Sequence, residues 1–433
     1  MNNKSHAMKE AAQYTRTPKV RFPEFRDAEG WKETELLTIA FPVSERAING
    51  DGDKVLSLSG EHGIVLQSDY FGKKIAGDNA ERYIKIVRND FVYNDRTTKQ
   101  SIYGTIKRLS KYEGGIVSPI YKCFRFNSEE NPAFWEWYFE SGVHESELGS
   151  LVNEGARAGR FNISIDKFLS TKVAHPNLPE QQKIAECLSS LDELMNAHSQ
   201  KLDALKAHKK GVMQQLFPRE GETFPRLRFP EFRDEGDWER RKLSDLLFEA
   251  KQRNRQLKYG PSDVLSVSGE YGCVNQIDLL GRSYAGVSVK DYHIVETEDI
   301  VYTKSPLKRN PYGIIKVNKG KPGIVSTLYA VYRATEICHP DYLDHYFSRD
   351  YHLNRYLQPI VRKGAKNDMK VNNAAVLGGE ILAPKLREQQ KIAQCLTSLD
   401  EVIHAQSQRL NALKDLKKGQ MQQLFPSPDE VDA

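Results

Sequence analysis

Two long stretches of the chain place apolar residues at alternating spacings of four and three positions. This spacing averages 3.5 residues, which is the heptad repeat of helices that pair as a coiled coil. The predicted seam of the first stretch consists of Ile184, Leu188, Leu191, Met195, Leu202 and Leu205. The predicted seam of the second stretch consists of Ile392, Leu396, Leu399, Ile403, Leu410 and Leu413. The pattern therefore predicts two long helices that pair along a narrow apolar stripe.

Each seam is interrupted by polar residues, His198 and Lys209 in the first stretch and Gln406 and Lys417 in the second. Such residues cost stability and can fix the register of a coiled coil, but they also suit a partly solvated seam. Packing of each helix onto its own domain is the alternative, and the narrowness of the stripe argues against it. Phe-Pro follows each stretch and is expected to end the helix, because the residue before proline disfavours helical geometry.

The chain consists of two copies of one module. Residues 21–36 and 228–243 both begin with RFPEF, and residues 178–218 and 386–426 are identical at 29 of 41 positions. The offsets are 228 − 21 = 207 and 386 − 178 = 208, and weaker similarity keeps the register between these blocks. A period near 208 residues is far longer than a solenoid repeat. We therefore expect two globular domains, each followed by a long helix.

The short connections predict the direction of the helices. The first helix ends near Phe217, and the second globular part begins within about ten residues. A domain of this size is compact, so both of its connections are expected at one end of the first helix. The two helices should then be antiparallel. The resulting hypothesis is that a rod of fixed length holds two similar domains apart.

The globular parts show a mixed pattern, which predicts the α+β class. Helix 132–140 is expected after Asn131 as cap and Pro132 at the first helical position, with Pro340 in the same place of the second copy. Short alternating runs predict strands at Lys54–Leu58, Tyr83–Val87, Phe91–Tyr93, Ile116–Ser118 and Tyr121–Phe126. The expected organisation is an N-terminal extension (1–20), a first domain (21–177), a first helix (178–218), a second domain (219–384), a second helix (385–426) and a tail (427–433).

Composition adds general limits. The 433 residues include 39% hydrophobic and 28% charged residues, which is typical of a folded globular protein. No apolar run approaches the 18 residues of a membrane span, and the N-terminus has no apolar signal segment. The five cysteines are scattered without a CxxC pattern, which argues against a zinc site or a disulfide framework. These features predict a cytoplasmic protein.

Charge is distributed unevenly within the modules. Residues 73–125 carry 12 Lys or Arg and 5 Asp or Glu, whereas residues 129–154 carry seven Glu and no basic residue. In the second module, residues 282–333 carry nine basic and four acidic residues. Such a distribution is expected of a domain that places one face on the phosphates of a nucleic acid, although basic surfaces without that role are common.

The sequence contains no recognisable catalytic motif. It has no P-loop, no G-x-S-x-G and no HExxH. Asn131-Pro132-Ala133-Phe134 differs by one residue from the NPPF-like motif of amino-methyltransferases, but no glycine-rich loop for S-adenosylmethionine precedes it. We therefore expect a chain that catalyses no reaction by itself, with no catalytic residue and no metal site.

The repeated blocks resemble those of the specificity subunits of type I restriction–modification systems. The resemblance rests on RFPEF…W…L before each module, GxIVS within it, and EQQKIAxCLxSLDE…KKGxMQQLFP after it, and it covers about residues 20–426. It implies that each globular part is a target recognition domain that reads one half of a bipartite, asymmetric site in double-stranded DNA. The paired helices would set the spacer between the half-sites.

The resemblance also implies partners. The helical regions would dock two modification (methyltransferase) subunits, and restriction (endonuclease/translocase) subunits would complete the nuclease. Adenine methylation and ATP-dependent cleavage would belong to those subunits. S-adenosylmethionine, ATP and Mg²⁺ would thus be cofactors of the complex, with none for this chain.

The internal repeat separates two kinds of DNA contact. Residues shared by two domains that read different half-sites cannot encode the difference, so shared basic residues are candidates for phosphate contacts. In register these are Lys73 with Arg282, Lys99 with Lys308, Lys107 with Lys316, and Arg157 with Lys366. Solvated loop charges are the alternative for each pair.

Base readout is expected where the copies diverge inside the aligned frame. The clearest such stretch is 94–102 against 303–311, directly before the shared Tyr103-Gly104 and Tyr312-Gly313. Arginine, lysine and glutamine can bind guanine or adenine there through paired hydrogen bonds. The candidates are Arg96, Lys99 and Gln100 in the first module, and Lys304, Lys308 and Arg309 in the second.

Two other functions stay open at this point. The chain could be a coiled-coil scaffold with two protein-binding domains, or a degenerate specificity subunit that docks its methyltransferase without reading DNA. An enzyme is the third reading, and the absence of cofactor motifs counts against it.

Overall fold

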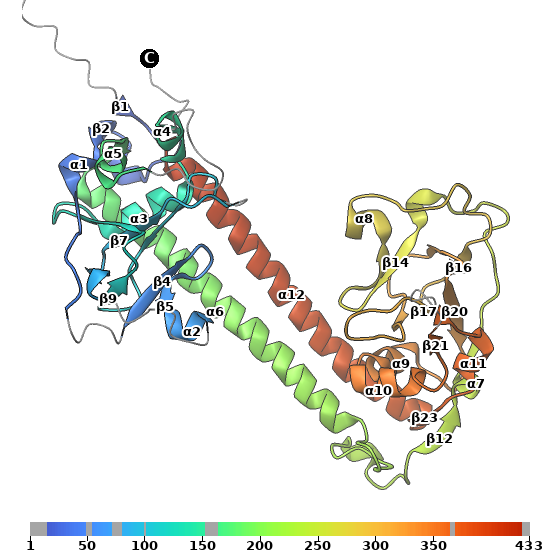
Figure 1. The fold of residues 1–433 in the computed structure, drawn as a ribbon. Coiled ribbons are helices and arrows are strands. Elements are labelled where there is room, and N and C mark those ends of the chain that lie inside the picture. Colours follow the sequence, from blue (N-terminus) through green and yellow to red (C-terminus); the bar gives the residue numbers. More distant parts are fainter. Residues whose placement is uncertain are drawn as a thin grey trace, which may run out of the picture. The chain divides into compact units, whose positions relative to one another are not determined.

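The computed structural model describes residues 15–48, 54–71, 80–98, 101–151, 163–363 and 369–426. The chain divides into two compact units, of which the first comprises Met1–Ser199 with Arg409–Ala433 and the second comprises Gln200–Gln408. Each unit therefore contains one globular domain and part of both long helices, α6 (Leu178–Leu216) and α12 (Leu386–Leu424). These helices are drawn in green and red in Figure 1.

The first domain contains three small sheets with strand orders β1-β2-β11, β3-β10-β7-β8 and β5-β4-β9-β6. Among the described strands of this domain, β4 and β9 pair in parallel and the other pairs are antiparallel. The strands are β1 (Thr15–Arg16), β2 (Trp31–Glu35), β3 (Ala40–Pro42), β4 (Val55–Ser59), β5 (Gly63–Leu66), β6 (Ile84–Val87), β7 (Phe91–Asn94), β8 (Thr105–Arg108), β9 (Gly114–Val117), β10 (Lys122–Phe126) and β11 (Lys172–His175). The helices are η1 (Pro23–Phe25), α1 (Leu36–Ile39), α2 (Gln67–Phe71), η3 (Ala80–Arg82), α3 (Pro132–Ser141), α4 (Glu145–Ser150) and α5 (Ile165–Leu169).

The second domain repeats this plan. Its sheet β13-β20-β17-β18 has the order of β3-β10-β7-β8, and β12-β23, β14-β15, β16-β19 and β21-β22 form pairs. The strands are β12 (Glu239–Lys242), β13 (Leu247–Glu249), β14 (Leu265–Ser268), β15 (Gly272–Asn275), β16 (His293–Val295), β17 (Ile300–Thr303), β18 (Ile315–Val317), β19 (Gly323–Val325), β20 (Tyr329–Ala334), β21 (Arg362–Lys363), β22 (Met369–Lys370) and β23 (Glu380–Ala383). The helices are η4 (Pro230–Phe232), α7 (Leu243–Leu246), η5 (Pro261–Asp263), α8 (Gln276–Leu280), α9 (Pro340–Phe347), α10 (Asp350–Leu357) and α11 (Asn373–Leu377).

The predicted α+β class and the duplication are thus confirmed. The five strands predicted in the first domain are present, with ends shifted by at most two residues. Helix α3 begins at Pro132 as expected, because the Asn131 side chain accepts hydrogen bonds from the backbone N–H groups of Ala133 (2.9 Å) and Phe134 (3.1 Å).

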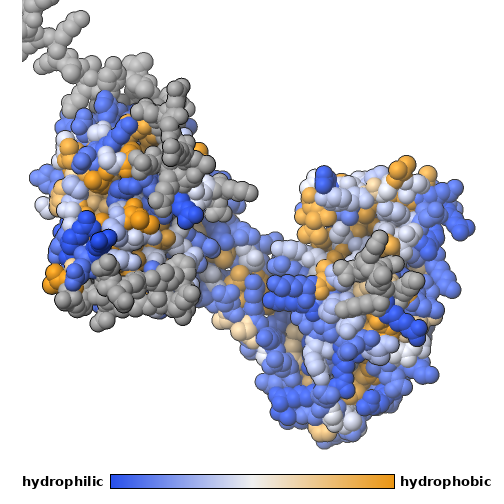
Figure 2. Space-filling view, viewed as in Figure 1, coloured by the Kyte–Doolittle hydropathy of each residue, from blue (hydrophilic) through white to orange (hydrophobic). Residues whose placement is uncertain are grey.

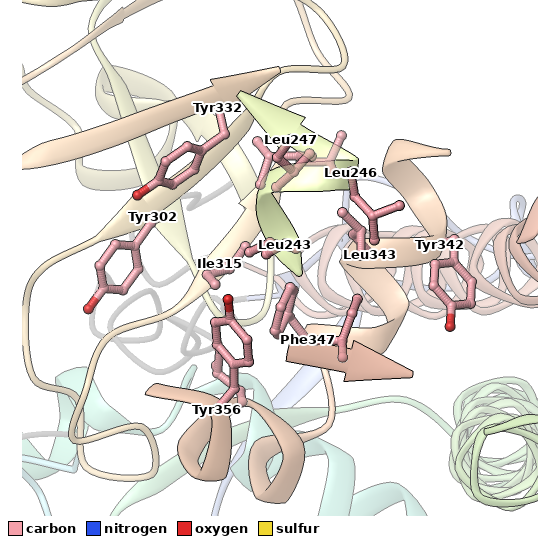
Figure 3. Packing of buried hydrophobic residues seen from close by; sticks show 14 of the residues in the cluster. Leu243, Leu246, Leu247, Tyr302, Ile315, Tyr332, Tyr342, Leu343, Phe347 and Tyr356 are labelled. Carbon is pink, nitrogen blue, oxygen red and sulfur yellow. The ribbon is translucent and has the colours of Figure 1, made fainter. Parts of the chain in front are cut away.

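Each domain has an aromatic core. In the first domain Phe126 stacks on Trp135, with 4.6 Å between the ring centroids. In the second domain buried tyrosines from the sheet, Tyr302 and Tyr332, lie with leucines of α7 and with Phe347 of α9 (Figure 3). On the face of each unit seen in Figure 2, hydrophobic residues form patches among hydrophilic ones.

The two long helices are antiparallel, as the connections predicted. In the first unit the beginning of α6 contacts the end of α12, where Lys417 forms an ion pair with Asp192. In the second unit the end of α6 contacts the beginning of α12, where Lys209 forms an ion pair with Asp400. The repeat offset of 417 − 209 = 208 relates the two lysines and also the two aspartates, so both units contain the same register.

The helices pack in two ways along their length. Ile184 and Leu188 belong to the core of the first domain, and Ile392 and Leu396 belong to that of the second. The first turns of each helix therefore pack onto their own domain. This part of the helices follows the alternative to a coiled coil that the sequence left open. Farther along, Leu202 and Leu410 are buried, whereas Leu191, Met195, Leu205, Leu399, Ile403 and Leu413 are half-buried.

A buried ion pair joins the start of each domain to the start of its helix. Arg21 of the first RFPEF block binds Glu180 through two hydrogen bonds of 2.9 and 2.5 Å, and the Trp31 indole N–H donates to the same carboxylate. Arg228 binds Glu388 through bonds of 2.9 and 2.8 Å in the second copy, with Trp238 in the role of Trp31. Both carboxylates have 1% of their side chain exposed.

The glutamine after each glutamate anchors a second helix. Gln181 accepts a hydrogen bond from the backbone N–H of Asn131, which caps α3, and donates to the carbonyl oxygen of Pro176. Gln389 accepts from the backbone N–H of His339, which precedes α9, and donates to the carbonyl oxygen of Pro384. The shared Glu-Gln therefore fixes the angle between each long helix and its domain.

The ion pair yields a stability prediction. Glu388→Ala leaves the guanidinium of Arg228 buried without its partner, so we expect a loss of about 3–5 kcal/mol of unfolding free energy. Urea unfolding of the full chain measures it. The control Glu231→Ala removes a surface pair with Lys391 and should leave the unfolding midpoint nearly unchanged. A loss no larger than that of the control would contradict the assigned role of the buried pair.

Candidate nucleic-acid interface

The four-stranded sheets β3-β10-β7-β8 and β13-β20-β17-β18 have the same strand order and the same supporting contacts. We call this shared arrangement the frame. At one end of this frame Arg125 of β10 binds Asp90, and Arg333 of β20 binds Asp299, each through two hydrogen bonds. The same aspartates accept a hydrogen bond of 2.8 Å from a backbone N–H three residues earlier, at Val87 and at Glu296. The strands β7 and β17 that follow these turns are therefore held identically.

The divergent loops begin where β7 and β17 end, and shared contacts hold their bases. The hydroxyl of Tyr93 donates to the carbonyl oxygen of Tyr103 (2.9 Å), and that of Tyr302 donates to the carbonyl oxygen of Tyr312 (2.7 Å). The next residue is Gly104 or Gly313, with φ of +87° and +90°. A Cβ at Gly313 would lie 1.9 Å from the carbonyl oxygen of Thr303, so only glycine fits. Each loop thus varies in sequence on a fixed support.

The base-readout candidates lie on these loops where the structure describes them. Arg96 is exposed, and its backbone N–H donates to the side chain of Asn94. Lys308 and Arg309 are exposed, and the carbonyl oxygen of Arg309 accepts a hydrogen bond from the Asn354 side chain of α10. Lys99 and Gln100 lie outside the described residues. Base readout by these residues stays a prediction.

Lys304 differs from the other candidates because it is half-buried in a cluster of charged groups. Burial lowers its pKa, an effect that Glu249 opposes and Arg253 reinforces. His293 is 2% exposed and its pKa is lowered to about 4, by burial first and then by Arg253 and Lys304. His293 is the first residue of β16 and its backbone pairs with that of Arg253.

The first domain has a different set of residues at these places. The residue after β7 is Asp95, which is buried and forms an ion pair with Lys122, whereas the residue after β17 is Lys304. Arg46 corresponds to Arg253, and it pairs with Ile84 where Arg253 pairs with His293. Sequence reasoning missed Arg46, Arg253 and His293. Arg46 lies 38 residues before its partner Ile84, and Arg253 lies 40 residues before its partner His293. No sequence pattern marks these separations, so only the structure reveals the two bridges.

The phosphate candidates fall into three groups. Lys73, Arg157 and Lys366 lie outside the described residues. Arg282 is exposed, with its guanidinium 4.6 Å from the ring centroid of Tyr284. Lys107 and Lys316, with side chains 15% and 12% exposed, form ion pairs with Glu140 of α3 and Asp344 of α9. The geometry of this last pair favours a role in joining sheet to helix, and its contact with phosphate stays a prediction.

Within the described residues, no group of three or more His, Cys, Asp or Glu side chains is placed to hold a metal ion. None of the helices in the described ranges is long and apolar enough to cross a membrane.

Comparison with known proteins gives three findings. Residues 121–207 match the family model described as type I restriction modification DNA specificity domain. A curated protein of Methanocaldococcus jannaschii, named as a candidate MjaX type I restriction enzyme specificity subunit, is 24% identical over 57% of this chain and 56% of its own length. The match thus spans about half the length of that curated relative.

The third finding concerns the fold. The crystal structure of a type I restriction–modification S subunit from M. genitalium is similar with a TM-score of 0.57, at 12% identity, over 95% of this chain and 99% of that one. At this identity the likeness shows a shared fold.

The His293 cluster yields a prediction about pH. Because the pKa of His293 in the folded chain lies below the usual 6.5, its contribution to stability is present above that value and is lost as pH falls toward 4. Between pH 7 and pH 5 we expect His293 to account for a loss of about 2 kcal/mol. His293→Ile, which places the residue of the first domain there, should reduce the loss accordingly in urea unfolding at the two pH values. An equal loss in both proteins would contradict the assignment.

Proposed function

We propose that this chain, which belongs to the family of type I restriction–modification specificity subunits, selects the DNA sequence on which such a complex acts. Each domain, within the proposed bounds 21–177 and 219–384, would bind one half of a bipartite, asymmetric site in double-stranded DNA. The observation that carries the proposal is a loop of variable sequence mounted on one shared support in both domains.

This arrangement suits a protein that reads two different half-sites. Contacts to phosphate position a protein on DNA, and contacts to base edges specify the sequence. The shared frame keeps the base of the reading loop constant, while the exposed residues of the loop differ, with Arg96 in one domain and Lys308 and Arg309 in the other. Guanidinium and ammonium groups suit the acceptors of guanine.

The long helices would set the distance between the half-sites. Support comes from the register, because Lys417 with Asp192 and Lys209 with Asp400 repeat one ion pair in the two units. Each lysine has 17% of its side chain exposed, so its ammonium group is partly withdrawn from water and favours the aspartate over a shifted register. The ion pairs thereby favour one register of α6 against α12, and a spacer of defined length requires a fixed register.

The helices would also dock two modification (methyltransferase) subunits, with restriction (endonuclease/translocase) subunits completing the complex. Exposed apolar residues at equivalent positions support this, since Leu194 of α6 is 44% exposed and Val402 of α12 is 48% exposed. S-adenosylmethionine, ATP and Mg²⁺ would be bound by those partner subunits, and this chain would act in the cytoplasm without catalysing a reaction itself.

The proposal predicts a methylation pattern that depends on the chain. Methylated adenines are mapped across the genome of cells that carry the cognate methyltransferase subunit, with and without this chain. We expect a bipartite motif only when the chain is present, because the methyltransferase alone lacks the two recognition domains. Co-purification with the methyltransferase in the absence of any chain-dependent motif would contradict DNA readout and favour a degenerate or scaffold protein.

A further inference from the structure

A loop of the second domain carries a bulky apolar residue in a conformation that such residues avoid. Leu257 has a φ of +53° and 60% of its side chain exposed. In the described part of the chain two other non-glycine residues have positive φ, Asn89 and Glu298, and both occupy the equivalent turns before Asp90 and Asp299. Leucine is disfavoured there because its Cβ approaches the following carbonyl oxygen. Glycine would adopt the same backbone without this strain.

The surrounding loop holds Leu257 in place. Asn254 is 1% exposed, and its side-chain amide donates to the carbonyl oxygens of Tyr259 (2.8 Å) and Val289 (3.2 Å) and accepts from the backbone N–H of Tyr259 (3.2 Å). The N–H of Leu257 donates to the carbonyl oxygen of Asn254 (2.9 Å). A buried amide thus braces both sides of the loop. Strained residues persist only where such contacts over-determine them, and they cluster at functional sites.

The same loop is strongly basic. Residues 251–259 contain Lys251, Arg253, Arg255 and Lys258 and no acidic residue, whereas the equivalent residues 44–52 of the first domain contain one basic and two acidic residues. Arg253 is fixed by a hydrogen bond of 2.8 Å from its guanidinium to the carbonyl oxygen of Asp291. The ammonium group of Lys258 lies 5.0 Å from the ring centroid of Tyr259. Arg255 and Lys258 are exposed on either side of Leu257.

The cluster around Lys304 adjoins this loop. Arg253 pairs with His293, whose pKa in turn responds to Lys304. The basic loop (residues 251–259) therefore lies near the base-readout candidate Lys304, whose charge interacts with that of Arg253. An apolar tip surrounded by cations matches duplex DNA, in which apolar base and sugar surfaces lie in grooves bordered by phosphates.

We propose that Leu257 is a DNA-contacting residue of the second domain, which places its side chain against bases or sugars in a groove of the second half-site. Arg255 and Lys258 bind the flanking phosphates. The inference rests on the proposed function and adds a specific recognition element to it. It also gives the strain a reason, because a leucine side chain that is 60% exposed buries little apolar surface, and glycine would adopt the same backbone without strain.

The test uses the full chain with Leu257→Gly, which removes the side chain and relieves the backbone. Binding is measured by fluorescence anisotropy on a duplex that carries both mapped half-sites, and on duplexes with either half-site scrambled. We expect an affinity loss of about tenfold on the intact site. Scrambling the second half-site should cost the variant less than it costs the wild type. The thermal midpoint should be unchanged or higher.

A matched control and three outcomes complete the test. Ile337→Ala changes another exposed apolar residue of the same domain, one whose carbonyl oxygen binds Gln389 at the helix junction, and should leave DNA affinity unchanged. Wild-type affinity in Leu257→Gly would overturn the inference while the proposed function stands. Loss of methyltransferase binding with unchanged DNA affinity would overturn it in favour of protein docking. A wild-type chain that does not discriminate between the intact and scrambled duplexes would overturn both proposals.

Discussion

The structure depends on a buried contact between an arginine and a glutamate at the start of each long helix. Arg21 with Glu180 and Arg228 with Glu388 join the first residues of a domain to a helix that begins about 160 residues later. A buried ion pair adds little net stability compared with apolar packing, but it is costly to leave half-made, so it favours one geometry over alternatives. The glutamine that follows each glutamate extends this geometry to α3 or α9. The most similar blocks of the two modules are therefore the blocks that build this joint.

A constant joint gives the variable parts a constant position. The same four-stranded sheet follows it in each domain, with the same aspartate–arginine pair and the same tyrosine at the base of the divergent loop. The two copies differ in the loops that follow β7 and β17 and share the contacts that support those loops. In the proposed function, this separation lets one scaffold read two different half-sites.

Much of the fold could be predicted from the sequence, because its signals are local. The heptad spacing of Leu188 or Leu396 indicates a helix, and Asn131-Pro132 indicates where α3 begins. The same spacing cannot tell which turns face a partner helix and which face a domain, so the burial of Ile184 in the core of the first domain needed the structure. Apolar residues recur at the same helical spacing whether they face a partner helix or a globular domain.

The candidate site was predicted less completely, because its contacts join distant residues. Lys107 appears as a free basic residue in the sequence, and its partner Glu140 lies 33 positions away on another element. Arg253 and His293 meet across an isolated bridge that no motif marks. Leu257, with its positive φ, lies in a loop that the buried side chain of Asn254 joins to Tyr259, and neither Leu257 nor Asn254 is distinctive by type or spacing.

The central claim is that the two recognition domains are interchangeable, because the same Arg–Glu joint and the same four-stranded sheet support the divergent loop of each. The most direct test replaces residues 21–177 with residues 228–385, so that both positions hold the second domain on the shared Arg–Glu joint. We expect a folded chain that directs methylation to a site in which the second half-site occurs twice in inverted orientation. A folded chain that still directs methylation to the original asymmetric site would contradict it.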